Sequence, residues 1–462
     1  MTIANVLGPT ARLVQHAAAR LDALSLDLAR DGGAIVRDAR ALADTATTYV
    51  RATPRVTRIA QAAAALFARQ RWLRLGQVAR TGTPALRPED HRELARRTAA
   101  YAAELRGGIA KLGQLASCRP DLVGPIWAGE LATLQDEVPP VDAAAIRARI
   151  GAELGRPVED VFAEFDDAPL AAASLAQVHA ARLVDGGECV VKVQVPGIED
   201  VIAADIAALR AIAAAVGEVP GIDLATLATE LSRALAEELD YAAEAAALAR
   251  YGGAAIVPRP IASASSQRVL TMTRVAGERL ATWLAHASAE DRDRLLGELV
   301  GEVAEQILVR GEVHADPHPG NFLVTPDGKL ALLDFGCTLV LSPAERAAYA
   351  RLVLAIAGGD LGRASAELAQ LGFAADDPAR LAELAAAMIG ALRPGTRTSE
   401  LDWQAAFADQ VAHARALGGL VIPRSFVLLG RVLASVAGLL ATYRPHLELH
   451  PLIARHLARA IA

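Results

Sequence analysis

The feature that most constrains this chain is a stretch of polar residues and glycines at 311–336, GEVHADPHPGNFLVTPDGKLALLDFG. Asp316 is followed five residues later by Asn321, and the stretch ends in DFG at 334–336. Two short apolar runs, FLV and LALLD, are joined by turn-forming residues at 325–328, so they are predicted to form a small β-hairpin. Such a hairpin returns the chain and brings Asn321 close to the DFG.

These residue types at this spacing suit the transfer of a phosphoryl group. That reaction needs Mg²⁺ against the nucleotide phosphates and a residue that orients the nucleophile. Mg²⁺ prefers oxygen ligands, so Asn321 and Asp334 are the predicted metal ligands, and Asp316 is predicted to face the attacking hydroxyl or water. We interpret His314 as a residue that organises the loop. For His318 we favour packing over a role as ligand or base. The two motifs together are typical of a protein kinase active site that uses ATP and Mg²⁺.

A kinase also needs a lysine on a strand of its small lobe, paired with a carboxylate on a helix. Lys192 is the candidate, because it lies in the short β-branched run ECVVKVQV, which follows the hairpin signal Asp-Gly-Gly. The chain after it, to about residue 248, has a helical pattern and is rich in acidic residues. The chemistry alone does not choose among these carboxylates: Glu230, Glu238, Asp240 and Glu244.

The glycine-rich phosphate loop of an ordinary protein kinase is missing. In its place, before Lys192, stands AAASLAQVHAARL at 171–183. The candidate phosphate-facing residues are Ala171, Ala172, Ala173 and Ser174, which have less φ freedom than glycine and approach a phosphate less closely. The start of an alanine-rich helix is the competing interpretation.

Charge and cysteine content exclude several classes of protein. The net charge is −6 and the pI is near 6.0, so no nucleic-acid partner is expected. Cys118, Cys189 and Cys337 are widely separated and form no CxxC pair, which argues against a disulfide framework or a zinc site and fits a reducing compartment.

The sequence also sets expectations about location. The first residues have no basic segment followed by an apolar core, so no secretory signal is expected there. The best membrane candidate, 426–443, contains Arg431 and is interpreted as a buried C-terminal core helix. We therefore expect a cytoplasmic protein, with peripheral contact at a membrane as the alternative.

Composition changes along the chain suggest four regions. Residues 1–85 contain alanine-rich amphipathic helices, whose apolar face is expected to pack on the main domain, with a lipid surface as the alternative. Residues 86–165 continue as helices broken by prolines. A small sheet with a helix is predicted within 166–275, and a helical region within 276–462. This layout predicts an α+β fold of the two-lobed protein-kinase type with a helical N-terminal extension.

An ordered set of short motifs between about residues 100 and 340 resembles the UbiB-like (AarF/ADCK) atypical kinase family. The set comprises KLGQ at 111–114 (the family's KxGQ), RPDL at 119–122, LQDEVPP at 134–140, the alanine-rich loop, VVKVQVPG, EELDYAAEA, HADPHPGN and LDFG. Members of this family are linked to ubiquinone and other isoprenoid-lipid metabolism. The resemblance therefore implies ATP and Mg²⁺ as cofactors and allows a lipid or a quinone precursor as a further ligand.

The resemblance also implies roles for individual residues. Lys192 is expected to pair with Glu238 and to face the nucleotide phosphates. Lys111, in the KxGQ that also contains Gln114, is expected to reach over the site towards Glu238 and Asp240. In this family the helical extension occupies the place where a peptide substrate would lie.

Adenine binding is expected at the end of the strand QRVLTMTRV, where Met272 and Thr273 lie. Relatives often carry a glutamate where this chain has Thr273. Because adenine is read there largely by backbone groups, nucleotide binding is expected to survive, while its affinity and base selectivity depend on this departure.

Two features argue against phosphorylation of other proteins. Few residues separate Gly336 from the predicted helix start at Ser342, and the lysine that serine/threonine kinases usually carry two residues after Asp316 is replaced by His318. ATP hydrolysis, or phosphorylation of a small molecule or lipid, fits better.

Two alternatives remain open. An aminoglycoside- or choline-type phosphotransferase shares HxDxxxxN and a later aspartate, but KLGQ and the alanine-rich loop count against it. A nucleotide-gated scaffold or lipid-binding module without turnover is the other. It is disfavoured because the chain keeps all the residues that inactive kinases tend to lose: Lys192, Asp316, Asn321 and Asp334.

Overall fold

A computed structural model of the chain describes residues 54–117, 123–134, 140–216, 224–401, 413 and 417–461. The RPDL motif and most of LQDEVPP lie outside the described residues, as do Cys118 and the amphipathic pattern before residue 54.

The chain divides into two compact units, each built from several segments. The first unit comprises Met1–Ala152, Asp167–His179 and Lys192–Leu239. The second comprises Glu153–Asp166, Ala180–Val191 and Asp240–Ala462. The region boundaries near 85, 165 and 275 that the sequence suggests stay predictions.

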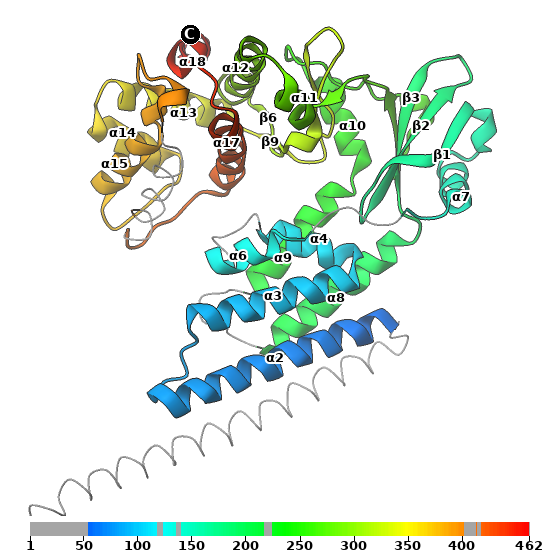
Figure 1. The fold of residues 1–462 in the computed structure, drawn as a ribbon, viewed down its shortest axis with the longest axis horizontal. Coiled ribbons are helices and arrows are strands. Elements are labelled where there is room, and N and C mark those ends of the chain that lie inside the picture. Colours follow the sequence, from blue (N-terminus) through cyan, green and yellow to red (C-terminus); the bar gives the residue numbers. More distant parts are fainter. Residues whose placement is uncertain are drawn as a thin grey trace, which may run out of the picture. The chain divides into compact units, whose positions relative to one another are not determined.

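The first unit is dominated by helices (Figure 1). Their bounds are α2 Pro54–Thr81, α3 Pro88–Leu105, α4 Gly107–Ser117, α6 Pro125–Leu131, α7 Ala143–Leu154, α8 Ile198–Val216 and α9 Leu224–Glu238. The alanine-rich sequence favours these helices because alanine has the highest helix propensity. On α3, Leu94, Ala95, Ala99 and Ala102 are buried together with one charged residue, Asp90, which accepts a hydrogen bond from Gln77 Nε2 at 2.7 Å.

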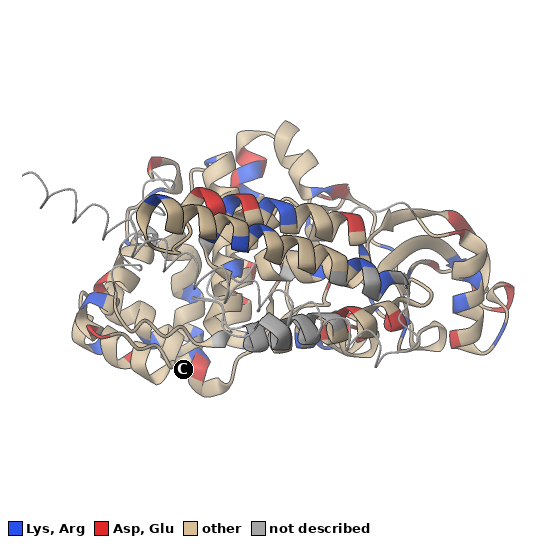
Figure 2. Cartoon of the chain, turned by 90° about the horizontal axis from the view of Figure 1, so that it is seen from below, with Lys and Arg blue, Asp and Glu red and all other residues tan. Residues whose placement is uncertain are grey.

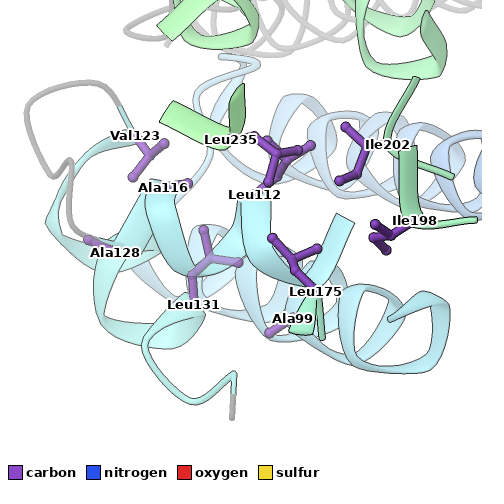
Figure 3. Close-up of a cluster of buried hydrophobic side chains, with 10 residues drawn as sticks. All are labelled: Ala99, Leu112, Ala116, Val123, Ala128, Leu131, Leu175, Ile198, Ile202 and Leu235. Atoms are coloured by element: carbon purple, nitrogen blue, oxygen red, sulfur yellow. The ribbon is translucent and has the colours of Figure 1, made fainter. Parts of the chain in front are cut away.

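The core of the first unit gathers around α4 (Figure 3). Leu112 is 4% exposed and packs in one cluster with Leu131 of α6, Ile202 of α8 and Leu235 of α9. Because Leu112 faces this core, the helix is held in one rotational setting. The neighbouring Lys111 therefore has a fixed direction.

A buried ion pair joins four helices of this unit. The Asp205 carboxylate on α8 has no exposed surface and accepts hydrogen bonds from Arg55 Nε at 2.7 Å and Arg55 Nη2 at 2.7 Å. Asp205 also accepts from the Ile109 backbone N–H at 3.0 Å, which satisfies one of the free amides in the first turn of α4. Arg55, on α2, also donates to the last carbonyls of α3, those of Leu105 and Arg106. Burial raises the pKa of Asp205, and Arg55 offsets part of this rise.

A four-stranded sheet has the strand order β1-β2-β3-β4. Its strands are β1 Phe162–Ala172, β2 Ala176–Leu183, β3 Glu188–Gln194 and β4 Val269–Thr273. The strands predicted around Lys192 and at 267–275 are confirmed as β3 and β4. We predicted neither β1 nor β2. The sequence of β1, FAEFDDAPLAA, is acidic and contains proline, both unusual for a strand, and β2 lies within the segment 171–183 that we interpreted as a phosphate loop or a helix start.

The second unit contains the remaining elements. Its helices are α10 Tyr241–Arg250, α11 Leu280–His286, α12 Ala289–Glu305, a π-helix at Gln306–Arg310, α13 Pro343–Ala357, α14 Leu361–Gln370, α15 Pro378–Met388, α17 Arg424–Tyr443 and α18 Leu449–Ile461. The 3₁₀ turns are Val158–Asp160, Ala262–Ala264, Pro319–Asn321, Gly390–Leu392 and Thr398–Glu400. The short strands β5 Glu278–Arg279, β7 Phe322–Val324 and β8 Leu330–Leu332 form one sheet, and β6 Glu312–His314 pairs with β9 Thr338–Val340.

One helix in the described part of the chain, Ser425–Tyr443, is long and apolar enough to cross a membrane, with a mean hydropathy of 1.8. Only 28% of this segment is buried. Val432 is fully buried while Leu433 is 46% exposed, so the helix buries one face. The expectation that 426–443 forms a buried core helix is therefore wrong for the face that contains Leu433.

Charged residues of both signs are interspersed over the elements drawn in Figure 2. This distribution agrees with the small net charge of −6.

We predict that Asp205→Ala will strongly destabilise the protein. Removing one partner of a buried pair leaves the other charge poorly compensated, and this costs about 3–5 kcal/mol. Urea unfolding followed by circular dichroism measures the change in the free energy of unfolding. Glu89→Ala is the control, because Glu89 lies 4.0 Å from Arg87 in an exposed ion pair of the same unit. Equal losses in the two variants would show that the Asp205 junction contributes no more than a surface pair.

Candidate active site

The predicted hairpin is confirmed and brings the two expected metal ligands together. Strand β7 pairs with β8 in antiparallel register, with Phe322 opposite Leu332. One step further, the Leu333 N–H donates to the Asn321 carbonyl at 3.0 Å. Asn321 and Asp334 therefore lie at the same open end of the hairpin.

The Asn321 side chain is oriented by the loop that contains Asp316. Its Nδ2 donates to the Asp316 backbone carbonyl at 3.0 Å. Because the amide nitrogen is used in this way, the amide oxygen is the atom left for a cation. The Asp316 side chain is 46% exposed, so its carboxylate is accessible to a nucleophile.

His314 organises the loop from its buried side. It is 4% exposed, and its Nε2 donates to the backbone carbonyl of Asp334. Its ring also meets Phe335 edge-on, with the ring centroids 5.0 Å apart. Burial lowers the pKa of His314, so the ring is neutral near pH 7. This geometry fits the interpretation of His314 as an organising residue.

The packing role favoured for His318 is wrong, because its side chain is exposed. Its Nδ1 accepts a hydrogen bond from the Gly320 N–H at 3.1 Å, so it caps the 3₁₀ turn Pro319–Asn321.

Two carboxylates flank Gly336. The Asp334 Oδ1 accepts from the Gly336 N–H at 2.8 Å. A β-carbon at Gly336 would lie 3.1 Å from Asp334 Oδ1 and 3.7 Å from Glu244 Oε2, so both acidic groups approach the same glycine. Glu244 is 2% exposed on α10. The sequence offered Glu244 only as one of several carboxylates, and its burial beside the DFG distinguishes it from the others.

A buried network fixes Phe335 of the DFG. The Phe335 ring meets Tyr251 edge-on, with the centroids 5.4 Å apart. The Tyr251 hydroxyl donates to Glu302 Oε1 at 2.8 Å, and Gln306 Nε2 donates to the same atom at 3.0 Å. Burial raises the pKa of Tyr251, so its hydroxyl keeps its proton and stays a donor.

Arg431 is a site residue that sequence reasoning missed. From α17, its Nε donates to the Ala315 backbone carbonyl at 2.8 Å. Its Nη2 lies 3.8 Å from Asp316 Oδ1 and 3.2 Å from Cys337 Sγ. The available signal was a lone arginine inside an apolar helix, which we took only as evidence against a membrane span.

In the first unit, Lys111 meets Glu238. The Lys111 Nζ lies 2.6 Å from Glu238 Oε1, and the two side chains are 16% and 32% exposed. Gln114 Nε2 donates to the Leu134 carbonyl at 3.4 Å, so this side chain ties α4 to the residues after α6. The site-covering role expected of Lys111 and Gln114 stays a prediction.

Lys192 lies on β3 between the buried residues Val191 and Val193. Its side chain is partly exposed, as expected when side chains alternate along a strand and the lysine lies on the face opposite to that of the buried valines. The pairing with Glu238 implied by the family resemblance stays a prediction. Asp240 caps α10, because its side chain accepts from the Ala243 N–H at 3.0 Å.

The alanine-rich loop is a turn between β1 and β2, so the competing interpretation as a helix start is wrong. The Ala173 N–H donates to the Ala176 carbonyl at 2.8 Å. None of the residues from Ala171 to Ser174 has a positive φ. The turn therefore closes without the conformation that requires glycine, which explains how alanines are tolerated there.

At the expected adenine site, Met272 is 5% exposed and Thr273 ends β4. The Thr273 backbone N–H donates to the Arg259 carbonyl at 2.9 Å, and the Thr273 hydroxyl accepts from the Arg259 N–H at 2.9 Å. A backbone hydrogen bond from Thr273 to adenine would therefore use its carbonyl oxygen.

The donor set fits Mg²⁺ better than a metal that needs many protein ligands. In the described residues, no group of three or more His, Cys, Asp or Glu side chains is placed to hold a metal. Mg²⁺ is usually bound by one or two carboxylates together with phosphate and water oxygens. Asn321 and Asp334 would supply the protein ligands in such a site.

Comparison with known proteins shows the family of the chain. The sequence profile of the ABC1 atypical kinase-like domain matches residues 133–367. A probable protein kinase UbiB from Xylella fastidiosa is 33% identical over 83% of this chain and 72% of its own length. An uncharacterised chloroplastic aarF domain-containing protein kinase of Arabidopsis thaliana is 38% identical over 58% of this chain.

Several curated relatives are much longer than their matched region. The match covers 39% of that Arabidopsis protein and 53% of an uncharacterised protein from Synechocystis. Among solved structures, the complex of Rv3197 with erythromycin from Mycobacterium tuberculosis covers 78% of this chain and 94% of that chain, with a TM-score of 0.58 and 24% identity. This likeness shows the fold, which is a two-lobed, kinase-like α+β fold. From the profile match and the Xylella relative, the chain belongs to the ABC1 atypical kinase-like family, the UbiB-like family that its motifs resemble.

Proposed function

We propose that this chain is an ATP- and Mg²⁺-binding enzyme that hydrolyses ATP or transfers its phosphoryl group to a small molecule or lipid. The observation that carries the proposal is the hydrogen bond between Leu333 and Asn321, which sets Asn321 and Asp334 at one end of the hairpin. Two oxygen ligands placed in this way suit Mg²⁺ bound to nucleotide phosphates. When bound, Mg²⁺ would neutralise the charge that develops on the transferred group.

In this proposal Asp316 orients the attacking hydroxyl or water. Its carboxylate is accessible, and Asn321 holds its backbone carbonyl. Lys192 and the loop Ala171–Ser174 face the phosphates, and Met272 and Thr273 contact adenine. Glu238, which forms an ion pair with Lys111 in the first unit, is also the carboxylate proposed to pair with Lys192.

The segment after the DFG supports a small acceptor over a protein. Between Gly336 and the helix cap Ser342 lie only Cys337 to Leu341, and strand β9 takes Thr338–Val340 of these. Ser342 and Glu345 form a capping box that fixes the start of α13. Little chain is therefore left to hold a peptide substrate.

The pathway part of the proposal rests on relatives. The name UbiB of the Xylella protein and the family's link to ubiquinone favour a role in ubiquinone or other isoprenoid-lipid metabolism. A lipid or quinone precursor as ligand, and peripheral contact with a membrane, belong to the same proposal.

The scaffold alternative has one observation in its favour. The Thr273 N–H is already used within the protein, and the alanines of the phosphate loop approach a phosphate less closely than glycines would, so nucleotide binding is less favoured than in an ordinary kinase. A scaffold would bind without turnover, so measurements of binding and turnover separate the two.

We predict that Mg-ATP will raise the thermal unfolding temperature by a few degrees in the wild-type protein and not in Asp334→Asn. A ligand at 100 times its Kd stabilises the folded state by about 2.7 kcal/mol. The measurement is a melting curve with ATP alone, Mg²⁺ alone and both. Asp327→Asn is the matched control, because Asp327 lies in the turn of the same hairpin and its side chain is 57% exposed. A shift of equal size in Asp334→Asn would place the metal elsewhere.

We also predict release of phosphate from Mg-ATP without transfer to added proteins. The short segment from Cys337 to Leu341 offers no platform for a peptide. The assay follows phosphate release and, in parallel, labelling of casein and myelin basic protein by radioactive ATP. Asp316→Asn should lower turnover by about 100-fold or more, the usual range for a lost general base. Labelling of either protein at the rate of ATP consumption would contradict the proposal.

A further inference from the structure

Asp316 lacks the cation that the catalytic loop of a serine/threonine kinase supplies. Two residues after Asp316 stands His318 instead of lysine. The His318 ring does not replace that lysine, because it is exposed and its Nδ1 accepts from the Gly320 N–H. A positive charge beside Asp316 must come from another element.

We propose that Arg431 supplies this charge from helix α17 and acts as the positioning residue for Asp316. Its Nη2 lies 3.8 Å from Asp316 Oδ1, within the range of an ion pair. The two side chains are 21% and 46% exposed, so the guanidinium is the more enclosed partner. The proposal rests on the function proposed above and assigns a further residue to the same site.

The position of the guanidinium explains how it orients the loop. Strands β6 and β9 are paired up to His314 and Thr338, and the next backbone bond runs from the Ala315 N–H to the Cys337 carbonyl at 2.9 Å. Arg431 binds at this point. Both its Nε and its Nη2 donate to the Ala315 carbonyl, and Nη2 reaches Cys337 Sγ at 3.2 Å.

The two strands separate immediately beyond this point. One continues into Asp316, and the other joins the DFG that ends at Gly336. A planar guanidinium with several donors can bridge two chain segments at once, which a lysine ammonium does less rigidly. Arg431 therefore ties the backbone before Asp316 to the residue after the DFG, and its charge faces the Asp316 carboxylate.

The surroundings of Arg431 on its own helix point to the same role. Val432 is fully buried and Leu429 is 2% exposed, so α17 packs through apolar residues on either side of the arginine. An arginine side chain that is only 21% exposed needs hydrogen bonds to offset its lost hydration. Those given above all lie in the catalytic loop and the residue after the DFG.

The test compares steady-state ATP turnover of the full-length wild-type protein with that of Arg431→Met, which keeps the length and loses the charge. We expect kcat to fall about 10- to 100-fold, the effect of a misplaced reacting group. The KM for Mg-ATP and the Mg-ATP shift in unfolding temperature should stay within about two-fold of wild type, because Asn321 and Asp334 keep their own contacts. Arg431→Lys should recover part of kcat.

Arg351→Met is the matched control. Arg351 is 29% exposed and bound to Glu367 at 2.7 Å in the same unit, away from the catalytic loop. Its loss should leave kcat within about two-fold of wild type, since its partners Glu367 and Gln370 take no part in the proposed site. An equal fall in kcat for Arg431→Met and Arg351→Met would show that Arg431 has only a structural role and would contradict the proposal.

Each other outcome also decides the matter. If Arg431→Met keeps the wild-type kcat, or loses both kcat and the Mg-ATP shift, the positioning role is overturned. If Arg431→Met does not fold, Arg431→Lys and Arg431→Gln take its place, and equal kcat in these two variants overturns the role of the charge. If the wild-type protein binds Mg-ATP without turnover, the proposed enzyme function is wrong, and the positioning role of Arg431, which depends on it, is wrong as well.

Discussion

The candidate site depends on one backbone hydrogen bond, from the Leu333 N–H to the Asn321 carbonyl. It continues the pairing of β7 with β8 by one residue and so fixes the position of Asn321 relative to Asp334. Two side-chain contacts add to this closure. Asn321 holds the Asp316 carbonyl, and His314 holds the Asp334 carbonyl from the buried side. Two oxygen ligands and an accessible carboxylate are thereby presented by a short piece of chain.

This part of the site could be predicted because its causes are local. The turn Thr325 to Gly328 determines the register of the hairpin, and the register determines which residues share its open end. The number of residues between Asn321 and Asp334 is therefore enough to predict that both lie at the open end of the hairpin. The strands around Lys192 and Met272 could be predicted for a similar reason, since β-branched residues and a glycine turn are local signals.

What could not be predicted depends on residues far apart in the sequence. Arg431 meets Ala315 across 116 positions, and Arg55 meets Asp205 across 150. Neither pair produces a periodic pattern in the sequence, because each contact involves a single residue from each of the two segments. Strand β1 was missed because its pairing partners override its acidic, proline-containing sequence. For His318 we favoured packing over a polar role, whereas its Nδ1 accepts a hydrogen bond from a backbone amide two residues away.

Arg431 and Asp205 nevertheless share a property that the sequence displays. Each is a charged residue in the middle of a helix with apolar residues directly on both sides of it in the sequence, although α8 also contains Glu199, Asp200 and Arg210. A charge in such a place is costly unless a specific partner receives it. The structure supplies those partners: a helix start and an arginine for Asp205, and the catalytic loop for Arg431. Departures from a local pattern thus mark the positions where distant segments are joined, and here they mark the two elements that orient Lys111 and Asp316.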